Sequence, residues 1–496
     1  SEGRREDRSY YKIRGQFMEN GFQKEREQLK KMKRTVESCP FRTRYHIMPP
    51  VGWLNDPNGL CQFRGVYHAY FQYSPLNVHG GGGFWGHCMS RDLLHWEYKE
   101  PVLTTDIPED ESGVYSGSAL IENDRMYLFY TGNVKKPGDY DYIDAGRIST
   151  QILTESEDGQ HMSEKVKLLG MEDYPEDMTQ HIRDPKVWKE NGRYFMVLGA
   201  RRRDWDSRGN RSDKGGMLLY TSGDKRKWSL YQEYVPEKPF GYMWECPDIF
   251  RLGGRKILSF CPQGLPSEAE KYQNIYQSGY SFLEDGQSPE ESFHEWDMGF
   301  DFYAPQTFET EDKRRILIGW AGMPDTEKIH RNLSVKNGWQ HCLTIPTELT
   351  FHDGRIFRMP VRELEDLPWA KMKKENGRYH WADRTVRLQI KEINGNRQTI
   401  RLGNEKNGLT ILADGDRVEL SFSGNSGNLS RCGGGRGRRT GRVEGMVREM
   451  LVIIDSSIVE VFVNSGETVF TTRIYLEKEE RELDVSGCSG CEIVAI

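Results

Sequence analysis

A pattern of paired apolar positions recurs five times along the first two thirds of the chain. Its reference positions are Asp56, Ser116, Asp184, Cys246 and Ala304. A large apolar residue stands four residues after each reference position, and a second one stands fourteen residues after it. A polar turn such as Gln62–Gly65 separates the two, and β-prone stretches such as VYHAY and KILSF surround the second. Each unit therefore predicts a β-hairpin, and the hairpins recur about every 60 residues.

Recurring hairpins without intervening helices are typical of β-propellers, whose blades hold about four strands each. Five units predict five blades, which we assign to residues 41–363. A β-sandwich with coincidental spacing is the alternative, but five matches at both offsets argue against it.

Two regions lie outside the repeat. Residues 364–496 alternate strand-like segments such as TVRLQI and MLVIID with Gly/Asn turns, which predicts a C-terminal β-sandwich. Residues 1–40 form an N-terminal extension, and the charged, proline-free segment 15–38 predicts a helix. The predicted fold class is all-β, a five-bladed β-propeller with a C-terminal β-sandwich and a short N-terminal helix.

Composition excludes several classes of partner. The 496 residues carry a formal net charge of −6, so the chain has no overall electrostatic reason to bind nucleic acid or an anionic membrane. No run of about 18 apolar residues predicts a membrane span, and the first forty residues show no apolar secretory segment. The Gly/Arg-rich insert 423–442 lacks aromatic residues for base stacking, so we predict a mobile, solvated loop there.

The nine cysteines are scattered along the chain, which favours reduced thiols and a cytoplasmic location over a disulfide framework. Cys488 and Cys491 form one C-x-x-C motif near the end of the chain. A structural zinc site needs about four ligands and no second pair stands nearby, so we predict no metal.

Three carboxylates stand at or beside the reference positions: Asp56, Asp184 and Glu245. Because the first strand of each propeller blade lines the central axis, we expect them to converge around one funnel. Crowded carboxylates raise at least one pKa, and a protonated acid beside an ionised carboxylate is what glycoside cleavage uses. Taken singly, Asp56 and Asp184 read as Asp-Pro turn residues and Glu245 as a surface residue. Their shared placement in the repeat favours a catalytic role for the three acids.

The blocks that contain these acids, WLNDPNGL, YSGSA, RDPKVW and WECPD, resemble the signature blocks of glycoside hydrolase family 32. FQYSP, FWGHCMSRDLLHW and FYAPQTF add further matches in the same order, and the resemblance covers about residues 41–365. The family comprises invertases, fructanases and sucrose-6-phosphate hydrolases. The resemblance implies a retaining β-fructofuranosidase in which Asp56 is the nucleophile, Glu245 the acid/base and Asp184 the transition-state stabiliser. It implies no metal and no organic cofactor.

The same resemblance implies a set of side chains that contact the sugar. They are Asn55, Gln72, Trp85, Tyr115, Ser116, Arg183, Tyr303 and Trp320. Amide, hydroxyl and guanidinium groups hydrogen-bond sugar hydroxyls, and aromatic rings cover apolar sugar faces. Tyr303 and Trp320 fit the hydrophobic core equally well. Cys246 is expected to be a packing neighbour of Glu245 rather than a nucleophile.

The expected partner is a small saccharide: sucrose, sucrose 6-phosphate or a short fructo-oligosaccharide. Basic residues expected at the funnel rim are candidates for binding a phosphate, and they are Lys135, Lys136, Arg201, Arg202 and Arg203. The alternative is that the arginines are solvated and paired with Asp204 and Asp206. A fructosyltransferase and a non-catalytic sugar-binding propeller remain as alternative functions, and the sequence predicts no oligomeric state.

Overall fold

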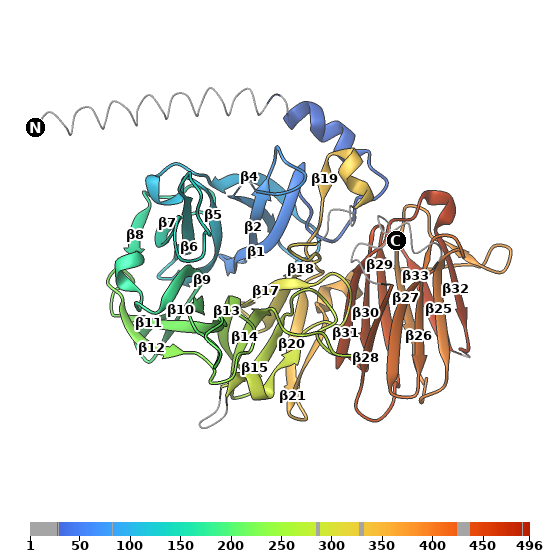
Figure 1. Cartoon of the computed structure of the whole chain (residues 1–496). Coiled ribbons are helices and arrows are strands. Elements are labelled where there is room, and N and C mark those ends of the chain that lie inside the picture. Colours follow the sequence, from blue (N-terminus) through green and yellow to red (C-terminus); the bar gives the residue numbers. More distant parts are fainter. Residues whose placement is uncertain are drawn as a thin grey trace, which may run out of the picture.

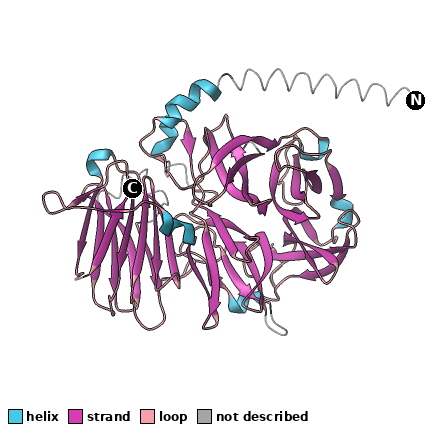
Figure 2. Cartoon of the chain, turned by 180° about the vertical axis from the view of Figure 1, so that it is seen from behind, coloured by secondary structure: helices cyan, strands magenta, loops and turns pink. Residues whose placement is uncertain are grey.

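The computed structural model describes residues 27, 29–81, 83–283, 288–326, 332–423, 437–488 and 490–496. Strands dominate it, which confirms the all-β prediction (Figure 2). Residues 29–37 are helical, inside the helix predicted over 15–38, whereas residues 15–26 and 28 lie outside the described residues. Across the described part of the chain, every helix is too short or too polar to cross a membrane.

Among the described residues, the strands from β1 to β21 form five small sheets. The first contains β1 (Gly52–Phe63), β2 (Val66–Ser74), β3 (Phe84–Ser90), β4 (Glu97–Leu103) and the short β19 (Trp339–Gln340). The second contains β5 (Val114–Glu122), β6 (Arg125–Lys135), β7 (Arg147–Ser156) and β8 (Val166–Leu169). The third contains β9 (Met178–Glu190), β10 (Arg193–Arg202), β11 (Lys214–Ser222) and β12 (Ser229–Tyr234). The fourth contains β13 (Met243–Leu252), β14 (Arg255–Gln263), β15 (Gly279–Phe282) and β16 (His294–Glu295). The fifth contains β17 (Tyr303–Glu309), β18 (Arg315–Trp320), β20 (Thr347–His352) and β21 (Arg355–Pro360).

The five predicted hairpins are present, because in each of these sheets the first strand in the chain pairs antiparallel with the next. The first strands also contact one another: β1 touches β5, β5 touches β9, β9 touches β13, β13 touches β17, and β17 touches β1 (Figure 1). All five reference positions of the repeat lie on these first strands. The sequence repeat therefore marks residues that the fold gathers around one centre.

Two six-stranded sheets complete the fold. One contains β22 (Ala370–Lys371), β33 (Cys491–Ala495), β24 (Thr385–Ile390), β29 (Met450–Asp455), β30 (Ile458–Val463) and β31 (Thr468–Arg473). The other contains β23 (Tyr379–His380), β32 (Glu482–Ser486), β25 (Gln398–Gly403), β26 (Gly408–Asp414), β27 (Arg417–Ser423) and β28 (Arg438–Arg442). Short 3-10 helices lie at Pro108–Asp110, Met171–Asp173, Pro289–Ser292, Leu333–Asn337, Arg362–Asp366 and Lys478–Glu480.

Strand β29 is buried on both faces, which explains its continuous apolar sequence MLVIID. Val452 and Ile454 point into the core between the two six-stranded sheets. Leu451 and Ile453 point the other way and share a core with residues of the first and fifth small sheets, such as Phe308. Successive side chains of a strand face opposite sides, so one strand joins both cores.

The prediction of a solvated loop over 423–442 is wrong for its last part. Residues 438–442 form strand β28, which pairs with β27. Arg439 in this strand is buried, with its guanidinium 4.2 Å from the centre of the Phe300 ring. Residues 424–436 lie outside the described residues.

Candidate active site

A β-bulge lies at each of the five reference positions. In β1, for example, Asn55 and Asp56 together oppose one residue of β2, and in β13 Cys246 and Pro247 together oppose one residue of β14. The same two-against-one register occurs in β5, β9 and β17. A bulge redirects the side chains at that point of a strand. Here it turns residues of five different sheets toward their common centre.

Two adjoining cavities open at this centre. The larger has a volume of about 940 Å³ and is lined by six of the predicted site residues: Asn55, Asp56, Arg183, Glu245, Tyr303 and Trp320. The smaller has a volume of about 460 Å³ and adds the four residues Gln72, Tyr115, Ser116 and Asp184. Ten of the eleven predicted residues are thus brought together, and both cavities are lined by Asp56 and Glu245.

The Asp56 carboxylate is held by its neighbours on β1 and β5. Its Oδ1 accepts a hydrogen bond of 2.9 Å from Asn55 Nδ2, and its Oδ2 accepts one of 2.6 Å from Ser116 Oγ. Burial raises the pKa of Asp56, and the charge of Glu245 raises it further, although the two hydrogen bonds oppose this shift. The hydrogen bonds fix the orientation of a carboxylate that faces a cavity.

Asp184 lies on β9 with a backbone φ of 65°, which is unusual for a residue other than glycine. Its side chain is only 7% exposed, and its Oδ2 accepts a 2.9 Å hydrogen bond from the Cys246 amide. Burial raises the pKa of Asp184 to about 7; Arg183 opposes the shift, whereas Glu245 and Asp56 add to it. The raised pKa of Asp184 therefore reflects the proximity of the three carboxylates, which the sequence predicted.

Glu245 on β13 is surrounded by hydrogen-bond donors. Its Oε1 accepts from Arg183 at 2.5 Å through Nη2 and at 3.1 Å through Nε. Its Oε2 accepts from the Tyr303 hydroxyl at 2.6 Å and from Gln263 Nε2 at 2.8 Å. Two guanidinium nitrogens of Arg183 thus contact one carboxylate oxygen, and two neutral donors contact the other. Together they fix the position and the plane of the carboxylate.

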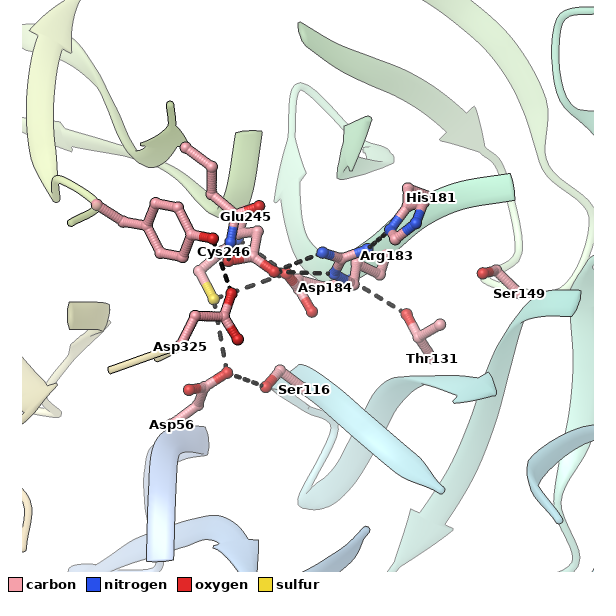
Figure 3. A network of polar contacts seen from close by, with 12 residues as sticks. Asp56, Ser116, Thr131, Ser149, His181, Arg183, Asp184, Glu245, Cys246 and Asp325 are labelled. Atoms are coloured by element: carbon pink, nitrogen blue, oxygen red, sulfur yellow. Dashed lines mark hydrogen bonds and ion pairs between the residues drawn. The ribbon is translucent and has the colours of Figure 1, made fainter. Parts of the chain in front are cut away.

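Cys246 connects the acids (Figure 3). Its Sγ lies 3.8 Å from Asp56 Oδ2 and 3.6 Å from Asp184 Oδ2. Burial, together with both nearby aspartates, raises the pKa of the thiol well above its usual value. A protonated thiol is a poor nucleophile, which agrees with the expectation that Cys246 is a packing neighbour.

Trp85 is the predicted sugar contact that the structure places elsewhere. It is fully buried, its Nε1 donates a 3.0 Å hydrogen bond to the Tyr115 carbonyl, and it lines neither cavity. It packs with Tyr70 and Tyr130 in a core between the first and second sheets. Trp85 lies on β3, the third strand of its sheet, and is separated from the centre by β1 and β2. Sugar contact by Trp85 therefore stays a prediction, one that the burial of this side chain does not support.

Several cavity residues were not predicted. His181 precedes Arg183 by two residues on β9, so both side chains fall on the same face of the strand, and Arg183 Nη1 lies 2.7 Å from His181 Nδ1. Arg147 begins β7, the third strand of the second sheet, which the repeat did not include. Gln263 stands seventeen residues after the reference position Cys246, at the end of β14. That offset also leads to Arg201, which was expected at the rim for its charge, so a longer repeat would have identified Gln263 as well.

The basic residues expected at the rim divide into two groups. Lys135 lines the smaller cavity and Arg201 the larger, whereas Lys136, Arg202 and Arg203 line neither. Arg202 is 3.7 Å from Asp204, and Arg203 is 2.7 Å from Asp144. The alternative of surface arginines paired with acids therefore holds for these two, although the partner of Arg203 is not the one expected.

Within the described residues, no group of three His, Cys, Asp or Glu side chains is arranged to hold a metal ion. The chemistry available at the site is thus that of three carboxylates, an arginine and hydrogen-bonding groups around a cavity large enough for a disaccharide.

Comparison with known proteins identifies relatives over nearly the whole chain. A model of the glycosyl hydrolases family 32 N-terminal domain matches residues 46–360, and a model of the family's C-terminal domain matches residues 416–492. A sucrose-6-phosphate hydrolase of Bacillus subtilis is 35% identical, covering 94% of this chain and 96% of the relative. One from Klebsiella pneumoniae is 37% identical, covering 87% of this chain and 88% of the relative.

A solved structure with a similar fold is the β-fructofuranosidase of Bombyx mori in complex with sucrose. It superimposes with a TM-score of 0.78 at 27% identity and covers 96% of this chain and 98% of the other. The likeness spans both groups of sheets, so the described fold agrees with that of a sucrose-binding relative.

Proposed function

The chain belongs to glycoside hydrolase family 32, and we propose that it cleaves the β-fructofuranosyl bond of sucrose, sucrose 6-phosphate or short fructo-oligosaccharides with retention. The observation that carries this proposal is the convergence of Asp56, Asp184 and Glu245 around one cavity, the two aspartates from bulges in β1 and β9 and Glu245 from beside the bulge in β13. Three acids gathered at one centre add nothing to the stability of a fold, whereas glycoside cleavage uses a pair of carboxyl groups held close together.

The proposed architecture is a closed, five-bladed β-propeller over residues 41–363 and a β-sandwich over residues 364–496, preceded by the extension 1–40. The cyclic contacts among β1, β5, β9, β13 and β17 support closure of the propeller. The end of β21 at Pro360 and the start of β22 at Ala370 support the boundary. A cytoplasmic location remains part of the proposal, supported by eight cysteines of the described residues that form no disulfide.

In the first step, a carboxylate oxygen of Asp56 attacks C2 of the fructosyl unit. The bond from C2 to the bridging oxygen breaks, and Glu245 gives its proton to that oxygen, so the other sugar leaves as an alcohol. Arg183, which is paired with Glu245, lines both cavities and is a proposed sugar contact beside the acid. Asp184 lies next to Asp56 and stabilises the positive charge that develops at C2.

In the second step, Glu245 takes a proton from a water molecule, and the water oxygen attacks C2. The ester bond to Asp56 breaks and fructose is released with its original configuration. Tyr303 and Gln263 hold Glu245 Oε2 and keep the carboxyl in place through both proton transfers. Asn55, Gln72, Tyr115, Ser116 and Trp320 are the remaining proposed sugar contacts.

The test is product analysis with purified enzyme on sucrose, sucrose 6-phosphate, kestose and inulin. We expect fructose release by the wild type and a loss of about 10³-fold or more in Asp56→Asn and Glu245→Gln, because each variant removes one half of the acid pair. Accumulation of longer fructosides instead of free fructose would identify a transferase. Saccharide binding without any product at any pH would identify a binding protein and overturn the proposal.

A further inference from the structure

Three arginines surround the ring of His181 at the wall between the two cavities: Arg147, Arg183 and Arg201. Burial and these three positive charges lower the pKa of His181 to about 2, so the ring is neutral at any working pH. Two of the arginines have acidic partners. Arg183 is paired with Glu245 at 2.5 Å and Arg201 with Asp213 at 2.7 Å.

Arg147 differs from the other two because its partners are neutral. Its Nη1 donates a 2.7 Å hydrogen bond to Asn133 Oδ1, and its Nε donates one of 3.1 Å to the Tyr142 carbonyl. It forms no ion pair with any carboxylate of the described residues, although it is only 8% exposed. A buried guanidinium of this kind carries a desolvation cost that a neutral partner only partly offsets.

A second cation lies directly opposite Arg147. In the antiparallel pairing of β6 and β7, Lys135 and Arg147 are register partners, so their side chains leave the sheet on the same face. Lys135 is exposed and also forms no ion pair within the described part of the chain. Its Nζ is 5.9 Å from the centre of the Tyr142 ring. Like charges directly opposite one another destabilise a strand pair, and here both line the smaller cavity.

We infer that Lys135 and Arg147 together bind a phosphate group on the sugar that leaves during the reaction. Two adjacent cations without acidic partners match a phosphate monoester, whose charge at neutral pH approaches two. Arg147 lines both cavities together with Glu245, which protonates the leaving sugar, so we assign the phosphate to that sugar rather than to fructose. The inference rests on the proposed function and selects sucrose 6-phosphate over unphosphorylated substrates.

This assignment differs from a site formed by the run of arginines at the end of β10, Arg201 to Arg203. Arg202 and Arg203 already have acidic partners and line neither cavity, and Arg201 is held by Asp213 and lies against the Tyr242 ring. Their charges are largely neutralised by the protein itself. Lys135 on β6 and Arg147 on β7 have no such acidic partner among the described residues, so their charges are available to a ligand.

The test compares kcat/KM for sucrose 6-phosphate with kcat/KM for sucrose in each variant. We expect Lys135→Met to lower the ratio of these two values by about tenfold or more, the effect of losing one hydrogen bond between charged groups. Lys135→Glu should lower it further. The matched control is Lys136→Met, which removes a neighbouring exposed lysine that lines neither cavity and should leave the ratio unchanged. Arg147→Met should also lower the ratio, even if the loss of its bond to Asn133 reduces both rates.

A binding measurement separates the phosphate site from catalysis. By titration calorimetry, the wild type should bind glucose 6-phosphate more tightly than glucose, and Lys135→Met should remove most of that difference. A wild type that cleaves sucrose but shows no preference for phosphorylated sugars, in turnover or in binding, would overturn the inference and leave the proposed function intact. An unchanged ratio in Lys135→Met would overturn it as well. A wild type that releases no fructose yet prefers glucose 6-phosphate would overturn the proposed function and retain the phosphate site.

Discussion

Asp184 occupies a position that costs the protein stability. Its φ of 65° is strained for a residue with a side chain, and burial raises the pKa of its carboxyl to about 7. Its hydrogen bond from the Cys246 amide and its proximity to Arg183 do not offset that burial. An unfavourable backbone and an unfavourable charge at one residue are more readily explained by a ligand that it contacts than by packing.

We therefore expect Asp184→Asn to stabilise the protein while abolishing fructose release. Because the folded pKa lies above the unfolded value of 3.8, the folded state holds more protons in the window between these values. The stability of the wild type accordingly falls as pH rises from about 4 to about 7. The gain in Asp184→Asn should be about 1–2 kcal/mol above that window and close to zero below it. Thermal unfolding at both ends of the window checks this, and an equal difference at the two pH values would contradict it.

The sequence predicted those site residues that the repeat or an Asp-Pro dipeptide marked. Asp56 and Asp184 stand at reference positions, and Glu245 adjoins one, so their convergence followed from the topology. Arg147 was missed because it lies on a third strand, beyond the two strands that the repeat aligned. Trp85 was predicted from the family resemblance rather than from the repeat, and the spacing says nothing of how far a third strand lies from the centre. Contacts made by third strands depend on packing between sheets, which a pattern within one unit does not contain.

The bulge in β5 depends on a glycine. A Cβ atom at Gly117 would lie 1.8 Å from the Phe129 carbonyl oxygen and 2.7 Å from Tyr130 Cα, both of which are backbone atoms of β6. The chain can therefore bring β5 and β6 this close only at a residue without a side chain. The preceding residue, Ser116, is the one that holds the Asp56 carboxylate.

Gly117→Ala should accordingly shift β5 and impair both folding and catalysis. We expect a loss of about 1–3 kcal/mol in the free energy of unfolding and a lower kcat, because Ser116 would no longer orient Asp56. Gly223→Ala is the matched control, since a Cβ atom there meets nothing within 4 Å. Urea unfolding and sucrose turnover measure the two effects; a Gly117→Ala enzyme with wild-type kcat would show that the bulge does not position the acid.

The segment before β1 is attached to the sandwich through a buried histidine. His46 Nδ1 lies 2.7 Å from Asp455 Oδ2 at the end of β29, and its Nε2 lies 2.8 Å from Glu460 Oε2 on β30. Burial alone would lower the pKa of His46, but the two carboxylates outweigh it and raise the pKa to about 9. The imidazolium thus connects the N-terminal segment to two strands of one sheet.

This arrangement predicts a loss of stability in mild alkali. Since the folded pKa of about 9 exceeds the unfolded value of 6.5, the contribution of His46 is complete below pH 6.5 and disappears as pH rises through about 9. Its size is at most about 3 kcal/mol. Denaturant unfolding from neutral pH to about pH 10 should show this fall in the wild type but not in His46→Gln, which should be less stable at neutral pH. A parallel fall in both proteins would assign the effect to other groups.

The sequence predicted two parts, because hairpins in residues 41–363 recur and later strands do not. How the two parts join did not follow. The two parts are joined by buried ion pairs and by strands that are apolar on both faces. In the sequence, each of these segments looks like an ordinary β-strand. Their role appears only when residues more than 100 positions apart are brought into contact, as with Asp301 and Arg473.

Asp301 and Arg473 join the segment just before β17 to the end of β31, and the same contact extends to the candidate active site. Arg473 Nη2 is 2.6 Å from Asp301 Oδ1, and both side chains are almost fully buried. Arg473 Nη1 lies 2.8 Å from His341 Nδ1. The His341 ring packs edge-on against Trp53 at 4.2 Å and Trp320 at 5.0 Å, and both tryptophans line the larger cavity. The sandwich therefore supports one wall of the site.

Asp301→Ala would leave the buried guanidinium without its carboxylate, which should lower the free energy of unfolding by about 3–5 kcal/mol. Because His341 would lose a fixed partner, we also expect a higher KM for sucrose at temperatures where the variant is still folded. Lys313→Ala, which removes an exposed pair with Glu309, should cost about 0.5 kcal/mol or less and leave KM unchanged. The double variant Asp301→Leu/Arg473→Met should recover most of the stability, since an apolar pair needs no charge compensation, but not the KM. Recovery of both would mean that the sandwich supports the wall through packing alone, and that His341 needs no partner from β31.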